Sequence, residues 1–551
     1  MKNIIAVIIL LCIFVVLVIS SMRENSGTCD EIAHHIPAGV IMLTKGDLKM
    51  DTSQPPLARY IIALPVVLFL NPVVPTEKEI WRVEDRSIFG RDFFFKDNIH
   101  PKRILFASRL MIVMIGCLCG LIIFLWSKSL FGIKTAVFAL FFYIFSPDII
   151  THAQLATTDM AATFFVLLSI YCFWRFSKNK NNLNLLITGI TLGLAQLAKY
   201  SAMILYPIFI FLMVIEFILA KRIIWKSCNS LILIFLLSIV TIWAGYGFSL
   251  KPILKDAMRV EEKLQVVDSQ TTRLLPFLNT NSRSKVNNFL LRIPVPLGEH
   301  LLGISGIAKH GKDGHRSYFL GRWSSGGNLL YFVVAFFIKT PISLLLLLIW
   351  GIFTLHKDTS LLNRYFLAVP PLIYFIVASF SNLQIGVRHL LPMYPFCFIL
   401  AASSVYLLEG KIFKAIFVIL CMWYVAGSLF IWPHYLSYFN ELAGGPDNGW
   451  KYLRDSNIDW GQDLPALGKY IKRNNIGEVR LMYFGEDSPG LYGINFKKIN
   501  NKEVIKPENK VYAISVQYLD SINWAINLKP TTKAGYSIFI YDFRDRTNVQ
   551  K

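Results

Sequence analysis

Long hydrophobic runs, separated by short polar segments, extend from the N-terminus to about residue 431. Runs of roughly 18 or more apolar residues are long enough to cross a bilayer as helices. The pattern predicts about eleven transmembrane helices, at approximately 3–21, 104–126, 132–147, 160–175, 183–198, 201–220, 229–249, 328–355, 365–380, 390–408 and 413–431. We therefore expect a mainly α, polytopic membrane domain over residues 1–431.

The rest of the chain, residues 432–551, has the composition of an ordinary soluble domain. Strand-like runs at 478–484, 511–516 and 536–541 accompany a helical pattern near 464–474. This stretch predicts a small α/β domain that lies outside the membrane.

Two loops between the apolar runs are long, at 22–103 and 250–327. The first contains Tyr60–Leu70, an apolar piece too short to span a bilayer and typical of an interfacial or re-entrant helix. Residues 1–21 lack a clear cleavage site, so we interpret them as an uncleaved first span.

Composition supports a membrane protein and excludes a soluble enzyme. The chain has 551 residues, of which 54% are hydrophobic and 17% charged, well below the usual quarter. Its net charge of +21 suggests nucleic acid at first, but many of the cations lie in short loops between apolar runs. The eight cysteines show no metal or disulfide spacing.

Basic loops alternate with loops poor in Lys and Arg, which sets an orientation by the positive-inside rule. The N-terminus is predicted to be cytoplasmic and the C-terminal domain periplasmic or extracellular, in a bacterial inner membrane. The cytoplasmic loops would carry Lys2, Lys128, Lys134, Arg175, Lys178, Lys180, Lys221, Arg222, Lys226, Lys357, Arg364, Lys411 and Lys414.

Ionisable side chains that could take part in catalysis lie in the opposite, external loops. Asp30 and Glu31 follow the first span, and His34 would share a helix face with them. Such a pair can also cap a helix at a membrane exit. Asp159, in Thr157-Thr158-Asp159, opens a span and is equally typical of an N-terminal cap.

Cations lie on the same side. Lys199 occupies a tight external link, where it either snorkels or binds an anion. Arg388 and His389 begin a later span, where Arg388 either anchors the interface or binds phosphate oxygens. Lys339-Thr340-Pro341 interrupts an apolar run, and there a structural role is favoured.

Together these residues suit transfer of a group from a phosphate-bearing lipid. A carboxylate would take the proton of an acceptor hydroxyl, and the cations would stabilise the departing phosphate.

Several motifs resemble membrane glycosyltransferases of family 39 type, the GT-C relatives of protein O-mannosyltransferases and of the lipid A aminoarabinose transferase. The resemblance covers nearly the whole chain. Its motifs are Asp30-Glu31-Ile32-Ala33-His34, Pro55-Pro56-Leu57, Thr157-Thr158-Asp159, Lys199-Tyr200-Ser201, Lys339-Thr340-Pro341, Arg388-His389-Leu390-Leu391-Pro392, Tyr438–Pro446, Asp455-Ser456-Asn457 and Asp459–Asp463.

The resemblance implies a GT-C fold and a hexosyl or pentosyl transferase that uses a polyprenyl-phosphate sugar, inverts the anomeric carbon and has no obligatory metal. Asp30 would be the catalytic carboxylate, with Glu31 beside it and Asp159 near the acceptor. Lys199 and Arg388 would bind the lipid phosphate, with His389 and His34 as further substrate-binding candidates. Gln54 departs from the family pattern, which often has His before Pro-Pro-Leu.

Other functions remain open on the sequence. The acceptor is a protein, lipid A or an envelope glycan, and no nucleic acid partner is expected. A transporter or flippase of lipid-linked saccharides is disfavoured because no internal repeat is visible. A nonenzymatic assembly protein is a further alternative. Asp455, Asp459 and Asp463 lack the pattern of an EF-hand, so they predict structure or acceptor contact.

Overall fold

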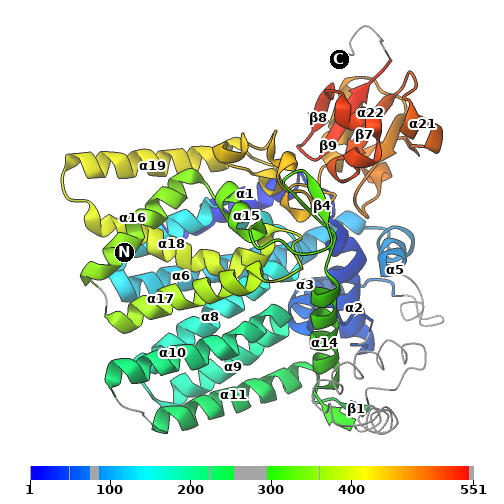
Figure 1. Cartoon of the computed structure of the whole chain (residues 1–551). Helices are drawn as coiled ribbons and strands as arrows, with labels where there is room; N and C mark the ends of the chain where they lie inside the picture. The colour runs from blue at the N-terminus through cyan, green and yellow to red at the C-terminus, as the bar shows by residue number, and fades with distance from the viewer. Residues whose placement is uncertain are drawn as a thin grey trace.

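The computed structural model describes residues 2–48, 50–74, 86–221, 225–252, 294–358 and 360–544. It consists of a large helical bundle with a small sheet beyond one of its ends (Figure 1). Helix α1 (Lys2–Met22) begins at the opposite end of the bundle from that sheet.

In the part of the chain that the structure describes, ten further helices belong to the bundle. They are α6 (Pro101–Ile144), α8 (Thr158–Lys178), α9 (Asn182–Ala198), α10 (Leu205–Ala220), α11 (Trp225–Gly245), α15 (Tyr331–Lys339), α16 (Ile342–Asp358), α17 (Leu361–Ser379), α18 (Tyr394–Ser403) and α19 (Lys411–Phe430).

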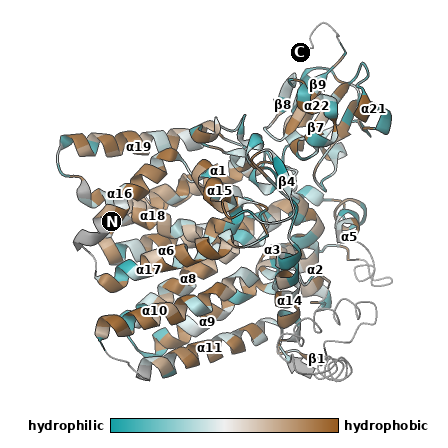
Figure 2. Cartoon of the chain, in the orientation of Figure 1, coloured by the Kyte–Doolittle hydropathy of each residue, from teal (hydrophilic) through white to brown (hydrophobic). Residues whose placement is uncertain are grey.

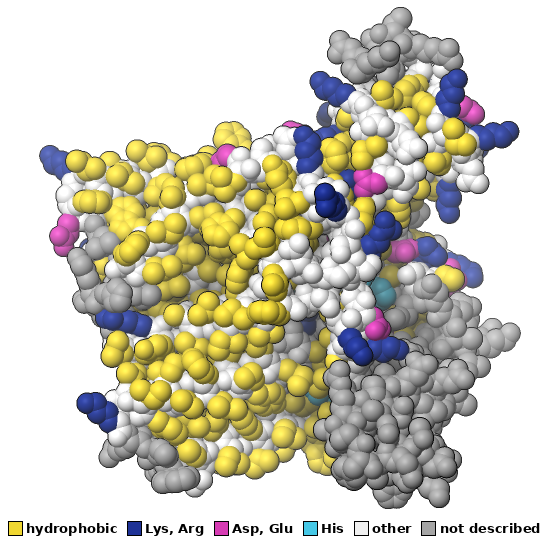
Figure 3. Space-filling model, viewed as in Figure 1, with side chains coloured by type: hydrophobic (Ala, Val, Ile, Leu, Met, Phe, Trp, Pro, Cys, Tyr) yellow, Lys and Arg dark blue, Asp and Glu magenta, His cyan; other side chains and the backbone are white. Residues whose placement is uncertain are grey.

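The outside of the bundle is apolar. Figure 2 shows the helices as predominantly hydrophobic, and in Figure 3 apolar side chains cover the visible side of the bundle. Isoleucines of α1 such as Ile4 and Ile8 expose more than half of their surface. Such a surface is stable against lipid tails, and helices satisfy their own backbone hydrogen bonds there. The chain is thus a multi-pass membrane protein.

Within the described residues, eight helices are long and apolar enough to cross a membrane, or up to nine if the bent α15–α16 pair forms one span. The predicted number of about eleven is not confirmed. Helix α9 has 17 residues and falls short of the length required. Helix α6 counts once, although its backbone breaks at Gly132 (φ 81°). Tyr143 Oη donates to the Gly116 carbonyl at 2.6 Å, so the two parts of α6 contact each other.

Short elements cover the end of the bundle nearest the sheet. Of these, α3 (Pro56–Phe69) matches the predicted short apolar helix; Gly39 of α2 allows it to pack closely against the Arg59 carbonyl. The others are the π-helix η1 (Glu31–His35), α2 (Ile36–Lys45), α5 (Arg86–Asp92), η3 (Phe93–Asp97), α7 (Pro147–Ala153), η4 (Tyr200–Ile204), α14 (Gly298–Asp313), η6 (Val387–Met393) and the strand pairs β1–β2 (Leu250–Pro252, Pro294–Pro296) and β3–β4 (Ser317–Phe319, Arg322–Ser324).

The C-terminal sheet has five strands in the order β6-β5-β7-β9-β8. Strand β5 pairs in parallel with β6 and β7, whereas β9 runs antiparallel to β7 and β8. The predicted strands and helix are confirmed. The elements are α20 (Leu464–Arg473), β5 (Val479–Met482), β6 (Phe496–Lys498), α21 (Asn501–Ile505), β7 (Val511–Ser515), α22 (Asn523–Asn527), β8 (Thr532–Ala534) and β9 (Ile538–Asp542).

Short turns of 3₁₀-helix complete the described chain, and several join α19 to α20. They are η7 (Ser404–Leu407), η8 (Tyr435–Ser437), η9 (Glu441–Ala443), η10 (Gly449–Lys451), η11 (Asp455–Asn457), η12 (Pro489–Tyr492) and η13 (Val516–Ser521).

Candidate active site

The helix that carries Asp30 begins at Thr28, and the side chain of Glu31 bonds back to Thr28. Ile32 N donates to the Thr28 carbonyl at 3.1 Å, while Glu31 Oε2 accepts from both Thr28 N and Thr28 Oγ1 at 2.9 Å. Glu31 thus fills the third position of a capping arrangement. The side chain of Asp30 makes no cap hydrogen bond. Of the predicted capping pair, therefore, Glu31 caps and Asp30 does not.

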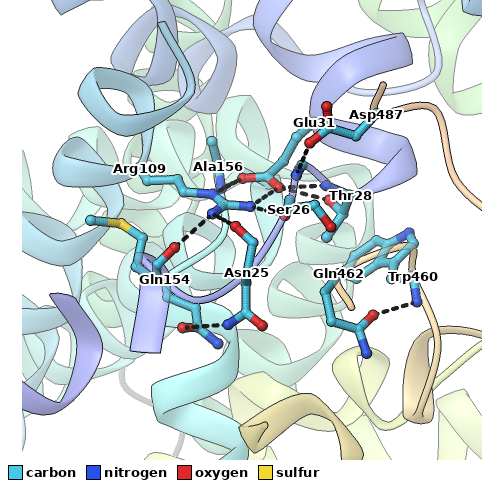
Figure 4. A network of polar contacts seen from close by, with 12 residues as sticks. Asn25, Ser26, Thr28, Glu31, Arg109, Gln154, Ala156, Trp460, Gln462 and Asp487 are labelled. Atoms are coloured by element: carbon cyan, nitrogen blue, oxygen red, sulfur yellow. Dashed lines mark hydrogen bonds and ion pairs between the residues drawn. The ribbon is translucent and has the colours of Figure 1, made fainter. Parts of the chain in front are cut away.

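Glu31 is fully buried and bound on both oxygens (Figure 4). Arg109 of α6 holds it in a bidentate pair, with Nε–Oε1 and Nη2–Oε2 distances of 2.7 Å. Ala156 N adds a further hydrogen bond to Oε1 at 2.7 Å. Burial acts to raise the pKa of Glu31, but Arg109 and the two backbone donors outweigh it and hold the pKa below its usual value. Glu31 therefore stays ionised and rigid.

Asp159, at the start of α8, pairs with the lysine between α9 and η4. Lys199 Nζ lies 2.6 Å from Asp159 Oδ1, and Thr157 Oγ1 donates to Oδ2 at 3.1 Å. Thr157 begins the helix without a side-chain cap bond. Lys199 therefore binds a carboxylate within the bundle.

Arg388 of η6 reaches both carboxylates of the site. Its Nη1 lies 2.9 Å from Asp30 Oδ2 and 4.0 Å from Asp159 Oδ2. The guanidinium also stacks over the Trp460 ring, 4.1 Å from its centroid. Arg388 Nε is buried and has no hydrogen-bond partner among the described residues.

Asp30 keeps 27% of its side chain exposed, so it is open to a substrate. Burial acts to raise its pKa, but Arg388, His34 and His35 together hold the pKa below its usual value. Of the predicted residues, the structure thus brings Asp30, Asp159, Lys199 and Arg388 into one cluster with no net charge.

The two predicted histidines flank this cluster. His34 Nδ1 lies 3.4 Å from Asp51 Oδ2, and its ring is close enough to Asp30 to act on that carboxyl electrostatically. His389 is packed edge-on against Phe332, within electrostatic range of Lys199 and Arg388.

Sequence reasoning missed three residues of the site. Arg109 lay inside a predicted span, and an arginine there normally signals a buried partner. His152 of α7 lies within electrostatic range of Asp159 and Arg388 and packs edge-on against Trp460. Burial lowers its pKa to about 4. Trp460 lies in the motif Asp459–Asp463, but no contact with Arg388 was predicted for its ring, because an aromatic in a loop has many ordinary uses.

Gln54 and Lys339 have structural surroundings. Gln54 lines a small cavity together with Glu299 and with Tyr200, the residue that follows Lys199. Lys339 Nζ donates to the carbonyls of Leu436 and Asn457 at 2.8 and 2.7 Å. Across the described ranges no group of three or more His, Cys, Asp or Glu could hold a metal ion, and metal independence stays a prediction.

Comparisons with known proteins identify the fold. Residues 102–243 match the family model described as dolichyl-phosphate-mannose-protein mannosyltransferase. No curated protein matches the chain in sequence. The structure of ArnT from Cupriavidus metallidurans bound to undecaprenyl phosphate aligns over 97% of both chains, with 10% identity and a TM-score of 0.51.

Two other similar structures align less well. The apo oligosaccharyltransferase of Archaeoglobus fulgidus aligns over 81% of this chain and 57% of its own, with 14% identity and a TM-score of 0.48. The Pmt1-Pmt2 complex of S. cerevisiae bound to the sugar donor aligns over 45% and 32%, with 18% identity and a TM-score of 0.33.

The family match and the ArnT-like fold confirm the resemblance seen in the sequence. The protein is a multi-pass membrane protein with a GT-C glycosyltransferase fold of the protein O-mannosyltransferase and ArnT type.

Proposed function

We propose that this protein transfers a sugar from a polyprenyl-phosphate donor to an extracytoplasmic acceptor, with inversion at the anomeric carbon. The sugar is a hexose or pentose, and the acceptor is a protein, lipid A or an envelope glycan. The carrier of the donor is of the kind held by ArnT in its undecaprenyl phosphate complex.

One observation carries the proposal. Two cations, Lys199 and Arg388, alternate with two carboxylates, Asp30 and Asp159, in a cluster at the end of an apolar bundle. Arg388 Nε has a buried proton without an acceptor among the described residues, which favours an anionic ligand. A lipid phosphate would enter here while its polyprenyl chain stays beside the apolar helices.

The chemistry follows from exchange of partners. When the donor's phosphodiester binds Arg388 and Lys199, Asp30 loses its guanidinium and becomes a stronger base. Asp30 then takes the proton of the acceptor hydroxyl as the acceptor oxygen attacks the anomeric carbon. The bond between that carbon and the phosphate oxygen breaks, and the polyprenyl phosphate leaves with its charge held by Arg388 and Lys199.

The other charged residues support this exchange. Glu31 and Arg109 hold the Asp30 turn in place, since both oxygens of Glu31 are already bound. Asp159 orients Lys199 through the contact between Lys199 Nζ and Asp159 Oδ1 until phosphate arrives. His34 and His389 are candidate contacts for the sugar or the phosphate.

The same proposal fixes the orientation. The bundle end with the cluster, together with a C-terminal domain over residues 432–551, would face the periplasm or the exterior of a bacterial inner membrane. The transmembrane domain would cover residues 1–431, with its N-terminus in the cytoplasm.

Mass spectrometry of envelope glycans and glycoproteins, with and without the protein, tests the proposal. Loss of one sugar from one acceptor class, restored by the wild-type chain and not by Asp30→Asn, is the expected result. Restoration by both chains would instead favour transport or assembly without catalysis.

A further inference from the structure

The segment 455–462, which leads into the C-terminal sheet, packs directly on the turn that carries Asp30. Cys29 N donates to the Trp460 carbonyl at 3.0 Å, and Ser26 N donates to the Gln462 carbonyl at 2.9 Å. These backbone bonds join two stretches that are far apart in the sequence. The C-terminal region therefore forms part of the site.

The same segment also holds the turn that carries Arg388. Val387 N donates to Asn457 Oδ1 at 2.9 Å, and Ser456 Oγ donates to the Ile385 carbonyl. Asp455 consequently lies between the segments that carry Asp30 and Arg388, within electrostatic range of both.

Asp455 has two features of a functional residue. Its backbone adopts a left-handed conformation (φ 57°), which is uncommon outside glycine and collects at functional sites. One carboxylate oxygen accepts from Ser456 N at 2.6 Å, and the side chain is half-buried. Burial raises its pKa to about 6, although Arg388 opposes the rise.

With Asp455 included, three carboxylates surround two cations. Asp30, Asp159 and Asp455 all act on Arg388, while Lys199 is bound to Asp159. A phosphodiester that binds there adds a further negative charge and takes over the guanidinium that partly neutralises Asp455. A proton on Asp455 would remove the resulting repulsion.

We propose that Asp455 is a third carboxylate of the transfer site and takes up a proton from solvent when the donor's phosphodiester binds Arg388. This inference rests on the proposed function. Among the described residues, the charged and titratable groups in electrostatic contact with Asp455 are Arg388, Asp30, Cys29, Tyr331 and Asp459.

The direction of the pH effect follows from linkage. Below about pH 6, Asp455 of the empty site already carries the proton, so binding requires no uptake. Above that pH, Asp455 must take up a proton from solvent each time a phosphodiester binds. The dissociation constant of the phosphodiester therefore rises by up to about tenfold per pH unit.

The test is binding of a polyprenyl methyl phosphodiester to the full-length protein in detergent, between pH 5.5 and 8.5 (roughly, the range that brackets the linkage). This probe keeps one negative charge throughout, so its own titration adds nothing. Asp455→Asn is the variant of choice, because Asn tolerates the left-handed backbone and still accepts from Ser456 N. The wild type should bind the probe more weakly as pH rises. Asp455→Asn should bind it at high pH at least as tightly as it does at low pH.

Asp459→Asn is the matched control, since this buried neighbour bonds to Ser515 in the sheet. Asp459→Asn should keep the wild-type pH dependence of binding. Any contribution from histidines is the same in all three proteins and cancels when they are compared. An identical pH dependence in the wild type and Asp455→Asn would overturn the inference alone. Failure of the wild type to bind the probe at any pH would overturn the proposed function as well.

Discussion

Arg388 Nη1 lies 2.9 Å from Asp30 Oδ2, although the two residues are 358 positions apart in the chain. The same guanidinium approaches Asp159 at 4.0 Å and rests on Trp460. A single cation thus joins the segment that follows α1, the start of α8 and the C-terminal region. Any anion that binds Arg388 alters all three, which makes this residue the centre of the expected chemistry.

Disruption of the Glu31–Arg109 pair should unfold the protein more easily. Glu31→Gln leaves the buried Arg109 charge without a counter-charge, and loss of one partner of such a pair costs about 3–5 kcal/mol. The measurement is thermal unfolding in detergent. Arg91→Gln is the control, because its half-exposed pair with Glu486 should contribute at most about 1 kcal/mol. Equal, small effects of both substitutions would contradict the assigned role.

Lys199 and Asp159 should affect phosphate binding in opposite directions. Lys199→Gln removes a charge-assisted contact and should weaken binding of the polyprenyl methyl phosphodiester by about tenfold or more. Asp159→Asn frees Lys199 from its carboxylate, so binding should be maintained or tightened while sugar transfer falls. The measurements are a binding titration and a transfer assay. Weaker binding in Asp159→Asn would show that Asp159 does not compete with phosphate.

Trp460 should tune the affinity of Arg388. Trp460→Leu removes a cation–π contact of about 0.5–2 kcal/mol, which corresponds to roughly two- to thirtyfold weaker phosphodiester binding. Trp460→Phe keeps an aromatic face and should recover part of the loss. The same binding titration measures both variants. Wild-type affinity in Trp460→Leu would mean that the ring only fills space.

Asp459 should make the protein less stable as pH rises. Burial raises its pKa to about 8, so between about pH 4 and pH 8 the folded state keeps a proton that the unfolded state releases. Stability then declines by up to about 1.4 kcal/mol per pH unit in this window. Unfolding temperatures measured across it should decline in the wild type and less in Asp459→Asn. A parallel decline in both would remove Asp459 as the cause.

Much of this arrangement was accessible from the sequence. The apolar runs and the strand patterns specify their own helices and strands locally, which is why the bundle and the sheet were predicted. The positive-inside rule then placed Asp30, Asp159, Lys199 and Arg388 on one side, and the structure brings them together.

The pairing within the site was not predictable. Glu31 and Arg109 are 78 residues apart. The sequence does not show which of the two adjacent carboxylates, Asp30 or Glu31, is bound to a distant arginine. Asp455 was one of three similarly spaced aspartates, and tertiary packing alone distinguishes it from Asp459 and Asp463. The break in α6 is different: the predicted spans at 104–126 and 132–147 meet close to Gly132, where the backbone leaves the helical conformation.

The most direct test of the account is a single turnover by donor-loaded, full-length protein, comparing the wild type with Asp30→Asn. Protein loaded with lipid-linked sugar from its own membranes would be mixed with acceptor extract, and released polyprenyl phosphate measured by mass spectrometry. We predict release by the wild type, and retention of intact donor by Asp30→Asn with a rate lower by about 10²–10⁴. Release at the wild-type rate from Asp30→Asn would contradict the assignment of Asp30 as the base.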